Sequence, residues 1–549
     1  MSKSAEPYPV PRPSLARSTA IMTVGTVLSR ATGLLRLMAV AAALGVAGNK
    51  VADTYNLANT APNIIYELVL GGILTSVFVP VFVDLLEKEG RERAWAVGSA
   101  ILNISLVALA VITVIGIIAA PLIAKFYAFR LEGAEAARQQ EAMTSLLRMF
   151  IPQIVFYGLT AITAGLLNAH KRFGPPMYTP VLNNLVVIAA FVAFYAMYGG
   201  DVALEDMSTG QLLLMGLGTT AGVVVMAFAQ LPFLRGLGRY QWTLSLRHPA
   251  LRRLGRMSLF VVGYVITNQL GYLVVQWLAN GEQGAYTAYV SAFMFFMLPH
   301  GLFAVSIMTA LLPSMSEHAS NARWDEFRER LSTGVRATFL LILPAAVGYF
   351  VLGEPIVRLL LERGNMTASD TELVAGVLRV FVLGLVPFSL FQLFLRAFYS
   401  THDTRTPFLI NVAAVVLNTA VNIPMFALFG VRGLAAGMAL AYTFGVLLQA
   451  RSLRRRLNGL DGHRITASFA RIGTAAAGMG LAVWGALAIT ERLVDPGTFV
   501  NNLTITILPV VVGAGVYLGL ASLLEVPELQ FTRGILSRKL GKGRSGSAP

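Results

Sequence analysis

Two arginines, Arg30 and Arg36, stand inside an otherwise apolar stretch that runs from residue 21 to residue 45. Each arginine at the centre of a membrane helix opposes insertion by about 2.5–3.5 kcal/mol, so the pair needs compensation. A water-filled cavity supplies that compensation, and planar guanidinium groups in such a cavity are suited to binding phosphate groups. Arg30 has an alternative, which is to reach the cytoplasmic interface. Arg36 is too deep for that and is the stronger candidate for substrate contact.

The spacing of the arginines constrains the helix that carries them. Six residues separate their side chains by roughly 9 Å along a helix axis and about 120° around it. Gly33 lies between them, and glycine can relax or kink a helix locally. We therefore expect either a hinge at Gly33 or a cavity wide enough to receive both side chains.

A second pair of polar residues, Asn63 and Glu67, follows Pro62 in the next apolar segment. Residues four apart lie on one face of a helix. Glu67 is a candidate partner for Arg36 that neutralises both side chains when the cavity is empty. The alternative for Asn63 is ordinary hydrogen bonding between helices, an interpretation that is stronger for Asn418 and Asn422.

The composition predicts a protein of the membrane. Of the 549 residues, 56% are hydrophobic and 13% are charged, whereas soluble domains contain about 25% charged residues. Alternating period-2 patterning is absent, which argues against a β-barrel. Long apolar windows predict an all-α integral membrane protein of about fourteen transmembrane helices. These windows lie near residues 18–45, 57–83, 96–124, 143–168, 178–198, 210–234, 257–279, 284–314, 333–353, 371–398, 406–428, 433–451, 467–490 and 500–524.

The net charge of +15 is distributed unevenly along the chain. Lys and Arg concentrate in the two tails and the even-numbered loops, whereas the loops at 199–209 and 280–283 contain acids and no basic residue. This asymmetry predicts a multi-pass protein of the bacterial plasma membrane with both termini in the cytoplasm. It explains the basic charge without a nucleic-acid partner. A cleaved signal peptide is disfavoured, because the arginines interrupt a short apolar run and many spans follow.

The two halves of the sequence resemble each other with an offset of six helices. NAHKRFGPPMYTPVLNN in the first half corresponds to RAFYSTHDTRTPFLIN in the second, each with Thr-Pro followed by Asn. An even offset predicts parallel repeats that form two lobes, with two extra helices at the C-terminus. We divide the chain into a disordered N-terminal tail, an N-lobe, a basic cytoplasmic loop, a C-lobe, helices thirteen and fourteen, and a basic C-terminal tail. The respective ranges are 1–17, 18–234, 235–256, 257–455, 466–524 and 525–549.

Five segments carry a resemblance to a known family. The chain resembles the MurJ (MviN) family of the multidrug/oligosaccharidyl-lipid/polysaccharide (MOP) flippase superfamily, over about residues 19–525. The segments are SRATGLLR, ADTYNLANTAPNIIYELVLGGILTSVFVPVF, NAHKRFGPPMYTPVLNN, ALLPSMS and RAFYSTHDTRTP. The second is most similar to actinobacterial-type members. The resemblance implies fourteen helices around a cationic cavity, and alternating-access transport of lipid II, an undecaprenyl-pyrophosphate-linked peptidoglycan precursor, to the outer leaflet.

The resemblance also implies roles for individual residues, although this chain departs from the family pattern. Arg30 and Arg36 match the family's two first-helix arginines, and Asp53 matches the acid of its second helix. The family's Arg-Arg pair is replaced by Tyr66-Glu67, and Met294 stands near the place of its eighth-helix arginine. The implied substrate-binding residues are Arg30, Arg36, Asn63, Glu67 and Asp53, with Gly33 as the hinge.

Other functions remain open at this point. They are a flippase for another lipid-linked oligosaccharide, a cation-coupled exporter, and a scaffold that recruits cell-wall synthesis proteins without transport. An enzyme is not expected, because a membrane-embedded transferase needs clustered acidic metal ligands. The chain has no cysteine and its histidines are scattered, so no metal centre or other cofactor is predicted. For energy coupling, sodium held by Asn268, Asn418 and Asn422 and the membrane potential are the two alternatives.

Overall fold

The computed structural model of the chain describes residues 15–46, 50–66, 79–129, 133–199, 203–243 and 249–529. Twelve helical segments among them are long and apolar enough to cross a membrane. The region of α2 (Val51–Tyr66) and α3 (Val79–Lys88) and the helix α9 (Pro249–Ala279) occupy the places of the two remaining predicted spans. Residues 67–78, between α2 and α3, lie outside the described residues. The predicted all-α membrane fold is confirmed.

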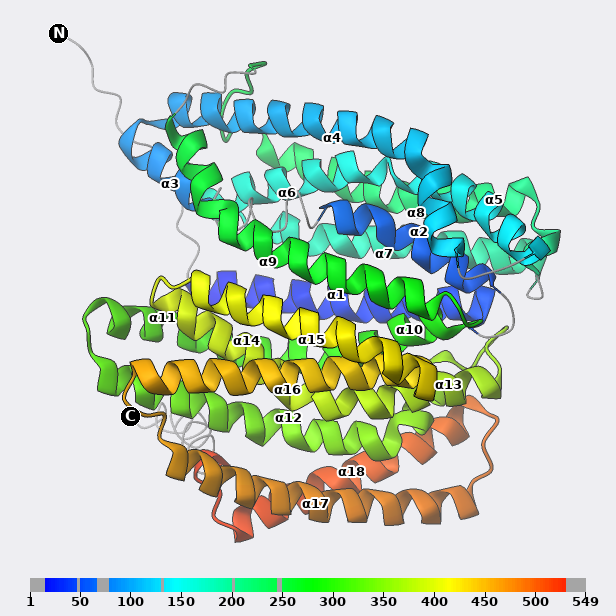
Figure 1. The fold of residues 1–549 in the computed structure, drawn as a ribbon, viewed down its shortest axis with the longest axis vertical. Coiled ribbons are helices and arrows are strands. Elements are labelled where there is room, and N and C mark those ends of the chain that lie inside the picture. Colours follow the sequence, from blue (N-terminus) through cyan, green and yellow to red (C-terminus); the bar gives the residue numbers. More distant parts are fainter. Residues whose placement is uncertain are drawn as a thin grey trace, which may run out of the picture.

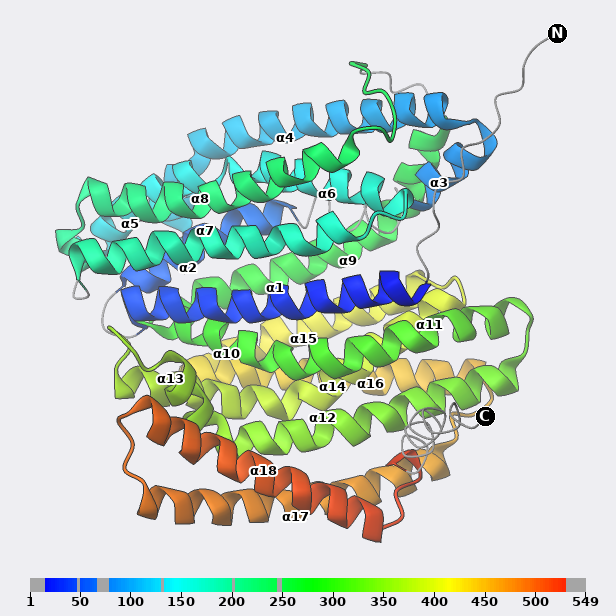
Figure 2. The same ribbon diagram turned by 180° about the vertical axis from the view of Figure 1, so that it is seen from behind.

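The N-lobe forms one half of the molecule, in the upper part of Figure 1. The first helix, α1 (Leu15–Leu44), packs along α7 (Gly174–Tyr198), and α8 (Thr209–Gln230) packs along the other side of α7. Outside this layer lies the longest helix of the lobe, α4 (Arg91–Ala128) (Figure 2). The fourth span of the lobe consists of α5 (Gly133–Phe150) and α6 (Gln153–Ala169).

The C-lobe forms the other half, and α9 belongs to it because it packs along α15. The predicted basic loop is shorter than expected, since α9 begins at Pro249. Two further helices, α17 (Gly462–Leu493) and α18 (Phe499–Leu523), pack on α12 at the outer edge of this lobe (Figure 1). The remaining helices are α10 (Ala285–Pro299), α11 (Val305–Ser320), α12 (Trp324–Leu361), α13 (Ala368–Phe381), α14 (Leu385–Ser400), α15 (Arg405–Phe429) and α16 (Val431–Arg456).

Two features recur at equivalent places in the lobes, as the predicted repeat requires. The fourth span of each lobe is interrupted, between α5 and α6 in the N-lobe and at a 3₁₀ turn between α13 and α14 in the C-lobe. In each lobe an asparagine of the fifth span packs against a glycine of the sixth. These pairs are Asn183 with Gly222 and Asn422 with Gly437. Both glycines therefore serve close helix packing.

Arginines join loops at the end of the molecule where α1 begins. Arg91 donates hydrogen bonds to the backbone carbonyls of Gly236 and Leu237, and Arg172 donates to that of Phe233, 2.8 Å away. In the C-lobe, Arg328 donates to the Leu457 carbonyl at 3.0 Å. We call this the basic end. The predicted even-numbered loops thus gather on one side of the molecule.

Candidate substrate cavity and interlobe seam

Arg30 lies where α1 faces the C-lobe. A Cβ atom built on Gly301 would lie 3.7 Å from the Nη2 atom of Arg30, so the guanidinium rests against the C-lobe. Arg30 is exposed and Arg36, further along α1, is half-buried. Among the described residues, neither guanidinium has a hydrogen-bond or ion-pair partner. No described residue therefore occupies either of the two predicted phosphate-binding groups.

The helix that carries these arginines runs unbroken through Gly33. Asn184 of α7 donates hydrogen bonds to the Thr32 hydroxyl at 3.0 Å and to the Ser29 carbonyl at 3.3 Å, which fixes this part of α1 on the N-lobe. A Cβ atom on Gly33 would lie 3.4 Å from the Cε atom of Met294 on α10. The glycine thus faces a neighbouring helix closely, and a hinge at Gly33 stays a prediction about movement.

Arg30 rests against a π-helical turn, His300–Ala304, that follows Pro299. Such turns recur at functional sites. His300 Nδ1 lies 3.0 Å from the hydroxyl oxygen of Ser389, and its ring packs edge-on against Phe388, with centroids 4.6 Å apart. These contacts fix the turn on α14.

A second guanidinium, that of Arg396 in the C-lobe, acts on the same turn. Arg396 follows Ser389 by two turns of α14, and Arg30 and Arg396 both act electrostatically on the His300 ring. Arg396 is half-buried and has no hydrogen-bond or ion-pair partner among the described residues. Two like charges from different lobes therefore act on one ring, and no described residue pairs with either of them. Arg396 lies within the expected span at 371–398, but the sequence does not show that it acts on the same turn as Arg30.

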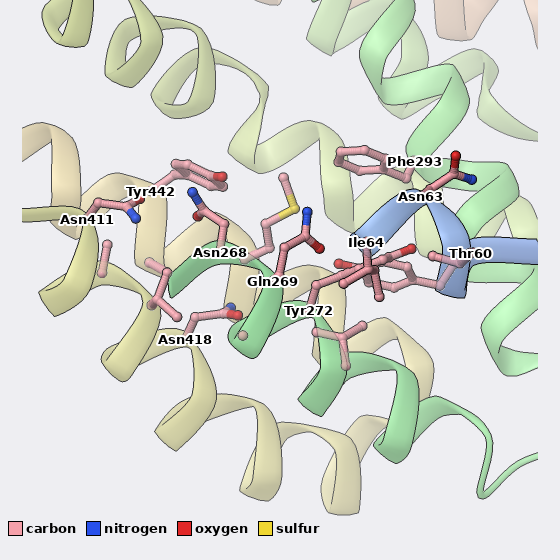
Figure 3. Close-up of a pocket in the computed structure, with 17 residues that line it drawn as sticks. Thr60, Asn63, Ile64, Asn268, Gln269, Tyr272, Phe293, Asn411, Asn418 and Tyr442 are labelled. Atoms are coloured by element: carbon pink, nitrogen blue, oxygen red, sulfur yellow. The ribbon is translucent and has the colours of Figure 1, made fainter. Parts of the chain in front are cut away.

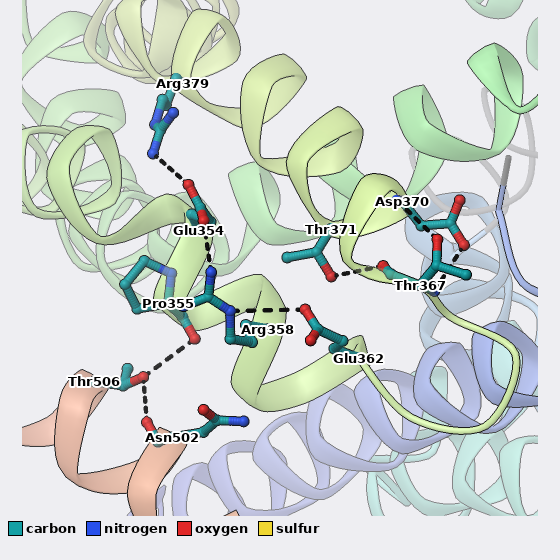
Figure 4. Close-up of polar contacts among 10 residues, drawn as sticks. All are labelled: Glu354, Pro355, Arg358, Glu362, Thr367, Asp370, Thr371, Arg379, Asn502 and Thr506. Carbon is teal, nitrogen blue, oxygen red and sulfur yellow. Dashed lines mark hydrogen bonds and ion pairs between the residues drawn. The ribbon is translucent and has the colours of Figure 1, made fainter. Parts of the chain in front are cut away.

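Another intramembrane arginine, Arg379, is neutralised within the C-lobe. Its Nη2 atom lies 3.2 Å from Oε2 of Glu354, whose Oε1 atom lies 2.6 Å from Arg358. Arg358 also faces Glu362 at 3.7 Å (Figure 4). The chain of alternating charges joins α12 to α13. Arg379 therefore belongs to a structural ion-pair network and is unlike Arg30 and Arg396.

Asp53 lies away from these arginines, at the boundary between the lobes, and is fully buried. Its Oδ2 atom accepts a hydrogen bond from the Gly284 backbone nitrogen at 2.7 Å. Its Oδ1 atom accepts from the Thr287 nitrogen at 2.8 Å and hydroxyl at 2.7 Å. A carboxylate of the N-lobe thus caps the first turn of α10 in the C-lobe. In this structure the Asp53 oxygens bind the start of α10, and the substrate-binding role that the resemblance implies for Asp53 stays a prediction.

Further hydrogen bonds join the lobes around Asp53. Lys50 donates to the carbonyl of Asn280 at 2.9 Å, and burial lowers the pKa of Lys50, although Asp53, Glu135 and Glu282 oppose the shift. We call these interlobe contacts the seam. Its other pairs are Ala42 and Ala43 with Asn365, Val46 with Asp370, Asn56 with Thr287, Thr60 with Tyr286, Tyr127 with Gln276 and Asn280, and Gln139 with Asn280.

The seam lies at the end of the molecule opposite the basic end. On the N-lobe side it includes the end of α1, the segment that follows, α2, and the ends of α4 and α5. On the C-lobe side it includes the ends of α9 and α10, the start of α13 and the segments before α10 and α13. Among the described residues, every hydrogen bond between the lobes belongs to this seam. The described hydrogen bonds therefore fasten the lobes at one end, as in a transporter that is closed on one side of the membrane.

Asn63, the remaining predicted site residue of α2, lines a cavity of about 390 Å³ between the lobes. The wall opposite Asn63 carries further uncharged polar residues, including Asn268 and Gln269 of α9 and Asn411 and Asn418 of α15 (Figure 3). We call this cavity the amide pocket. Glu67, the proposed partner of Arg36, lies outside the described residues.

Comparison with known proteins gives this architecture a family. A family model described as "Lipid II flippase MurJ" matches residues 40–505. A probable lipid II flippase MurJ of Rhizobium tropici is 29% identical over 76% of this chain and 78% of its own length. The lipid II flippase MurJ of Burkholderia cenocepacia is 29% identical over 80% of this chain and 84% of its own length.

Solved structures show the same fold. A lipid II flippase MurJ in an inward closed conformation superposes with a TM-score of 0.72 and 21% identity, covering 95% of this chain and 99% of that one. An inward-facing multidrug resistance MATE transporter of the MOP superfamily superposes with a TM-score of 0.63 and 13% identity, covering 81% of this chain and 99% of that one. With the family model spanning most of the sequence, the two-lobed membrane protein described above belongs to the MurJ lipid II flippase family.

Proposed function

We propose that the chain moves lipid II from the cytoplasmic to the outer leaflet of the bacterial plasma membrane by alternating access. The observation that carries this proposal is that Arg30 and Arg396, from different lobes, act on one π-helical turn, and that no described residue forms an ion pair with either. Guanidinium groups bind phosphate oxygens in a bidentate manner. A pyrophosphate between them relieves their mutual repulsion and couples its own position to that of both lobes.

The direction of opening follows from the charge distribution. Arginine-rich loops occupy the basic end, and the positive-inside rule places that end, with both termini, in the cytoplasm. The seam then closes the outer side, and the cavity receives substrate from the cytoplasmic leaflet. Transport requires the seam to part while the basic end closes.

The membrane potential fits the described residues better than sodium as a source of energy. Asn418 and Asn422 exchange hydrogen bonds at 3.1 and 3.4 Å, and Asn268 donates to the Tyr264 carbonyl at 3.0 Å. The amide oxygens of Asn418 and Asn422 thus each accept from the other residue's amide nitrogen, and no carboxylate stands among the described residues that line the pocket. A potential favours outward movement of an anion by about 2.3 kcal/mol per charge per 100 mV.

Reconstitution tests the proposal. The full chain is placed in liposomes with fluorescent lipid II, and an impermeant quencher reports the leaflet that holds the label. We expect the wild-type chain to exchange lipid II between leaflets and Arg30→Gln to slow exchange at least tenfold. Arg379→Gln is the matched control, since Arg379 is paired with Glu354. Exchange no faster than in protein-free liposomes would overturn the proposed function.

A further inference from the structure

We propose that the amide pocket binds the uncharged sugar next to the pyrophosphate of the transported lipid. The inference rests on the proposed function and names the part of the substrate that the arginines leave unexplained. The pocket is lined by α2 from the N-lobe and by α9, α10, α15 and α16 from the C-lobe. A ligand in it therefore contacts both lobes.

The chemistry of the pocket lining favours a neutral, hydroxyl-bearing ligand. None of the described residues that line the pocket is charged, so an ionic ligand would find no partner among them. Side-chain amides offer both donors and acceptors, as sugar hydroxyl and acetamido groups require. Aromatic rings supply apolar faces on which the CH groups of a sugar ring can pack. These rings are Tyr272, Tyr289, Phe293 and Tyr442 (Figure 3).

One amide of the lining has no protein partner. Asn411 is 2% exposed, and its Nδ2 atom has no hydrogen-bond acceptor. Its neighbours differ, because Asn268 donates to a backbone carbonyl and Asn418 is paired with Asn422. An unsatisfied buried donor costs folding free energy, so its retention calls for an explanation. An acceptor oxygen of a bound sugar satisfies it.

The pocket has a suitable size and position. Small-molecule sites enclose about 300–1,000 Å³, and a volume of about 390 Å³ lies within that range. Phe293 of the pocket and His300 beside the arginines lie seven residues apart on one continuous helical segment, which is roughly 10 Å along its axis. A sugar in the pocket can therefore be joined directly to a pyrophosphate held by Arg30 and Arg396.

The test uses the purified full chain in detergent, with N-acetylglucosamine and inorganic pyrophosphate as separate probes. Binding is measured by calorimetry, and the unfolding temperature is measured alongside. Asn411→Leu removes the unpartnered amide. Gln449→Leu is the matched control, because Gln449 is equally buried and unpartnered on α16 but does not line the pocket.

We expect Asn411→Leu to weaken N-acetylglucosamine binding at least tenfold, while pyrophosphate binding stays unchanged and the unfolding temperature does not fall. Gln449→Leu should leave both affinities unchanged. Equal sugar affinity in Asn411→Leu and the wild type, or no measurable sugar binding by the wild type, would overturn the inference. Sugar binding that depends on Asn411, in a chain that does not move lipid II, would instead reject the proposed function alone.

Discussion

The carboxylate of Asp53 holds Thr287 through two hydrogen bonds, one from the backbone nitrogen at 2.8 Å and one from the hydroxyl at 2.7 Å. The two residues belong to different lobes, and both are buried. Because backbone groups at the start of α10 are donors to this carboxylate, the contact is lost as a unit when the lobes separate. Asp53 therefore belongs to the machinery that holds the seam closed.

Replacing Asp53 should shift the equilibrium between the closed and open seam. Asp53→Ala leaves the Gly284 and Thr287 nitrogens without their acceptor, so the closed state loses its hydrogen bonds and the open state does not. Spin labels on Glu141→Cys and Glu372→Cys, exposed positions of different lobes in a cysteine-free chain, report the distance across the seam. We expect a longer mean distance and at least tenfold slower lipid II exchange. Glu205→Gln, an exposed acid, is the control.

The arginine pair should show non-additive anion binding. Arg30→Gln and Arg396→Gln should each weaken pyrophosphate binding about tenfold, or roughly 1.4 kcal/mol. The double variant should lose less than the sum of the single losses, because both side chains contact one anion. Titration calorimetry in the presence of constant salt measures the three affinities. Strictly additive losses of binding free energy would contradict a shared site. An Arg379→Gln variant that weakens pyrophosphate binding as much as Arg30→Gln or Arg396→Gln would contradict it too.

His170 should make the stability of the chain depend on pH. Burial lowers the pKa of His170, and the Arg91 and Arg172 guanidiniums lower it further, while a hydrogen bond to the Leu166 carbonyl opposes the shift. Its folded pKa thus lies below the unfolded value of about 6.5. The unfolded state then binds the proton more tightly, so stability falls as the pH falls below about 6.5.

The measurement is the unfolding temperature of the detergent-solubilised chain at pH 7.5 and pH 5.5. His170→Phe keeps an aromatic ring between Phe82 and Trp95, whose centroids lie 5.8 and 5.9 Å from the imidazole, and cannot titrate. We expect this variant to lose less stability on acidification than the wild type. His463→Phe, at an exposed position, should behave like the wild type. An unchanged pH dependence in His170→Phe would reject the assignment.

Much of the fold could be predicted because membrane helices are encoded locally. The expected span at 406–428 is α15, Arg405–Phe429, and the span at 500–524 is α18, Phe499–Leu523. Glycines four residues apart, Gly218 and Gly222 in α8 and Gly433 and Gly437 in α16, are likewise typical of close helix packing. In the structure, Gly218 meets Ala190 and Gly433 meets the Met425 backbone.

The candidate site was only partly predictable, because its geometry depends on contacts between lobes. The cost of a buried charge singled out Arg30 and Arg36 from sequence. Nothing in the spacing of Asp53 reveals that residues more than two hundred positions away donate to it. The same holds for the approach of Arg396 to Arg30. The missing partner of Asn411 also becomes visible only when every neighbouring helix is in place.

The orientation of the chain should be testable by labelling from outside intact cells. Glu205→Cys lies in the loop before α8 and Arg239→Cys lies in the loop after it, and both positions are exposed. The basic-residue asymmetry places the first outside and the second in the cytoplasm. An impermeant maleimide should therefore label only the first. Labelling of position 239 with position 205 protected would invert the topology and the direction of opening.

The central claim is that the chain carries lipid II across the membrane with the pyrophosphate held by arginines between the lobes. Its most direct test is the leaflet distribution of lipid II in a bacterium depleted of its own flippase and supplied with this chain. We predict that the wild-type chain restores lipid II to the outer leaflet. Arg36→Ala, at equal membrane abundance, should leave it in the cytoplasmic leaflet, because removing this charge empties no packed core. Restoration by Arg36→Ala, or failure of an equally abundant wild-type chain, would contradict the account.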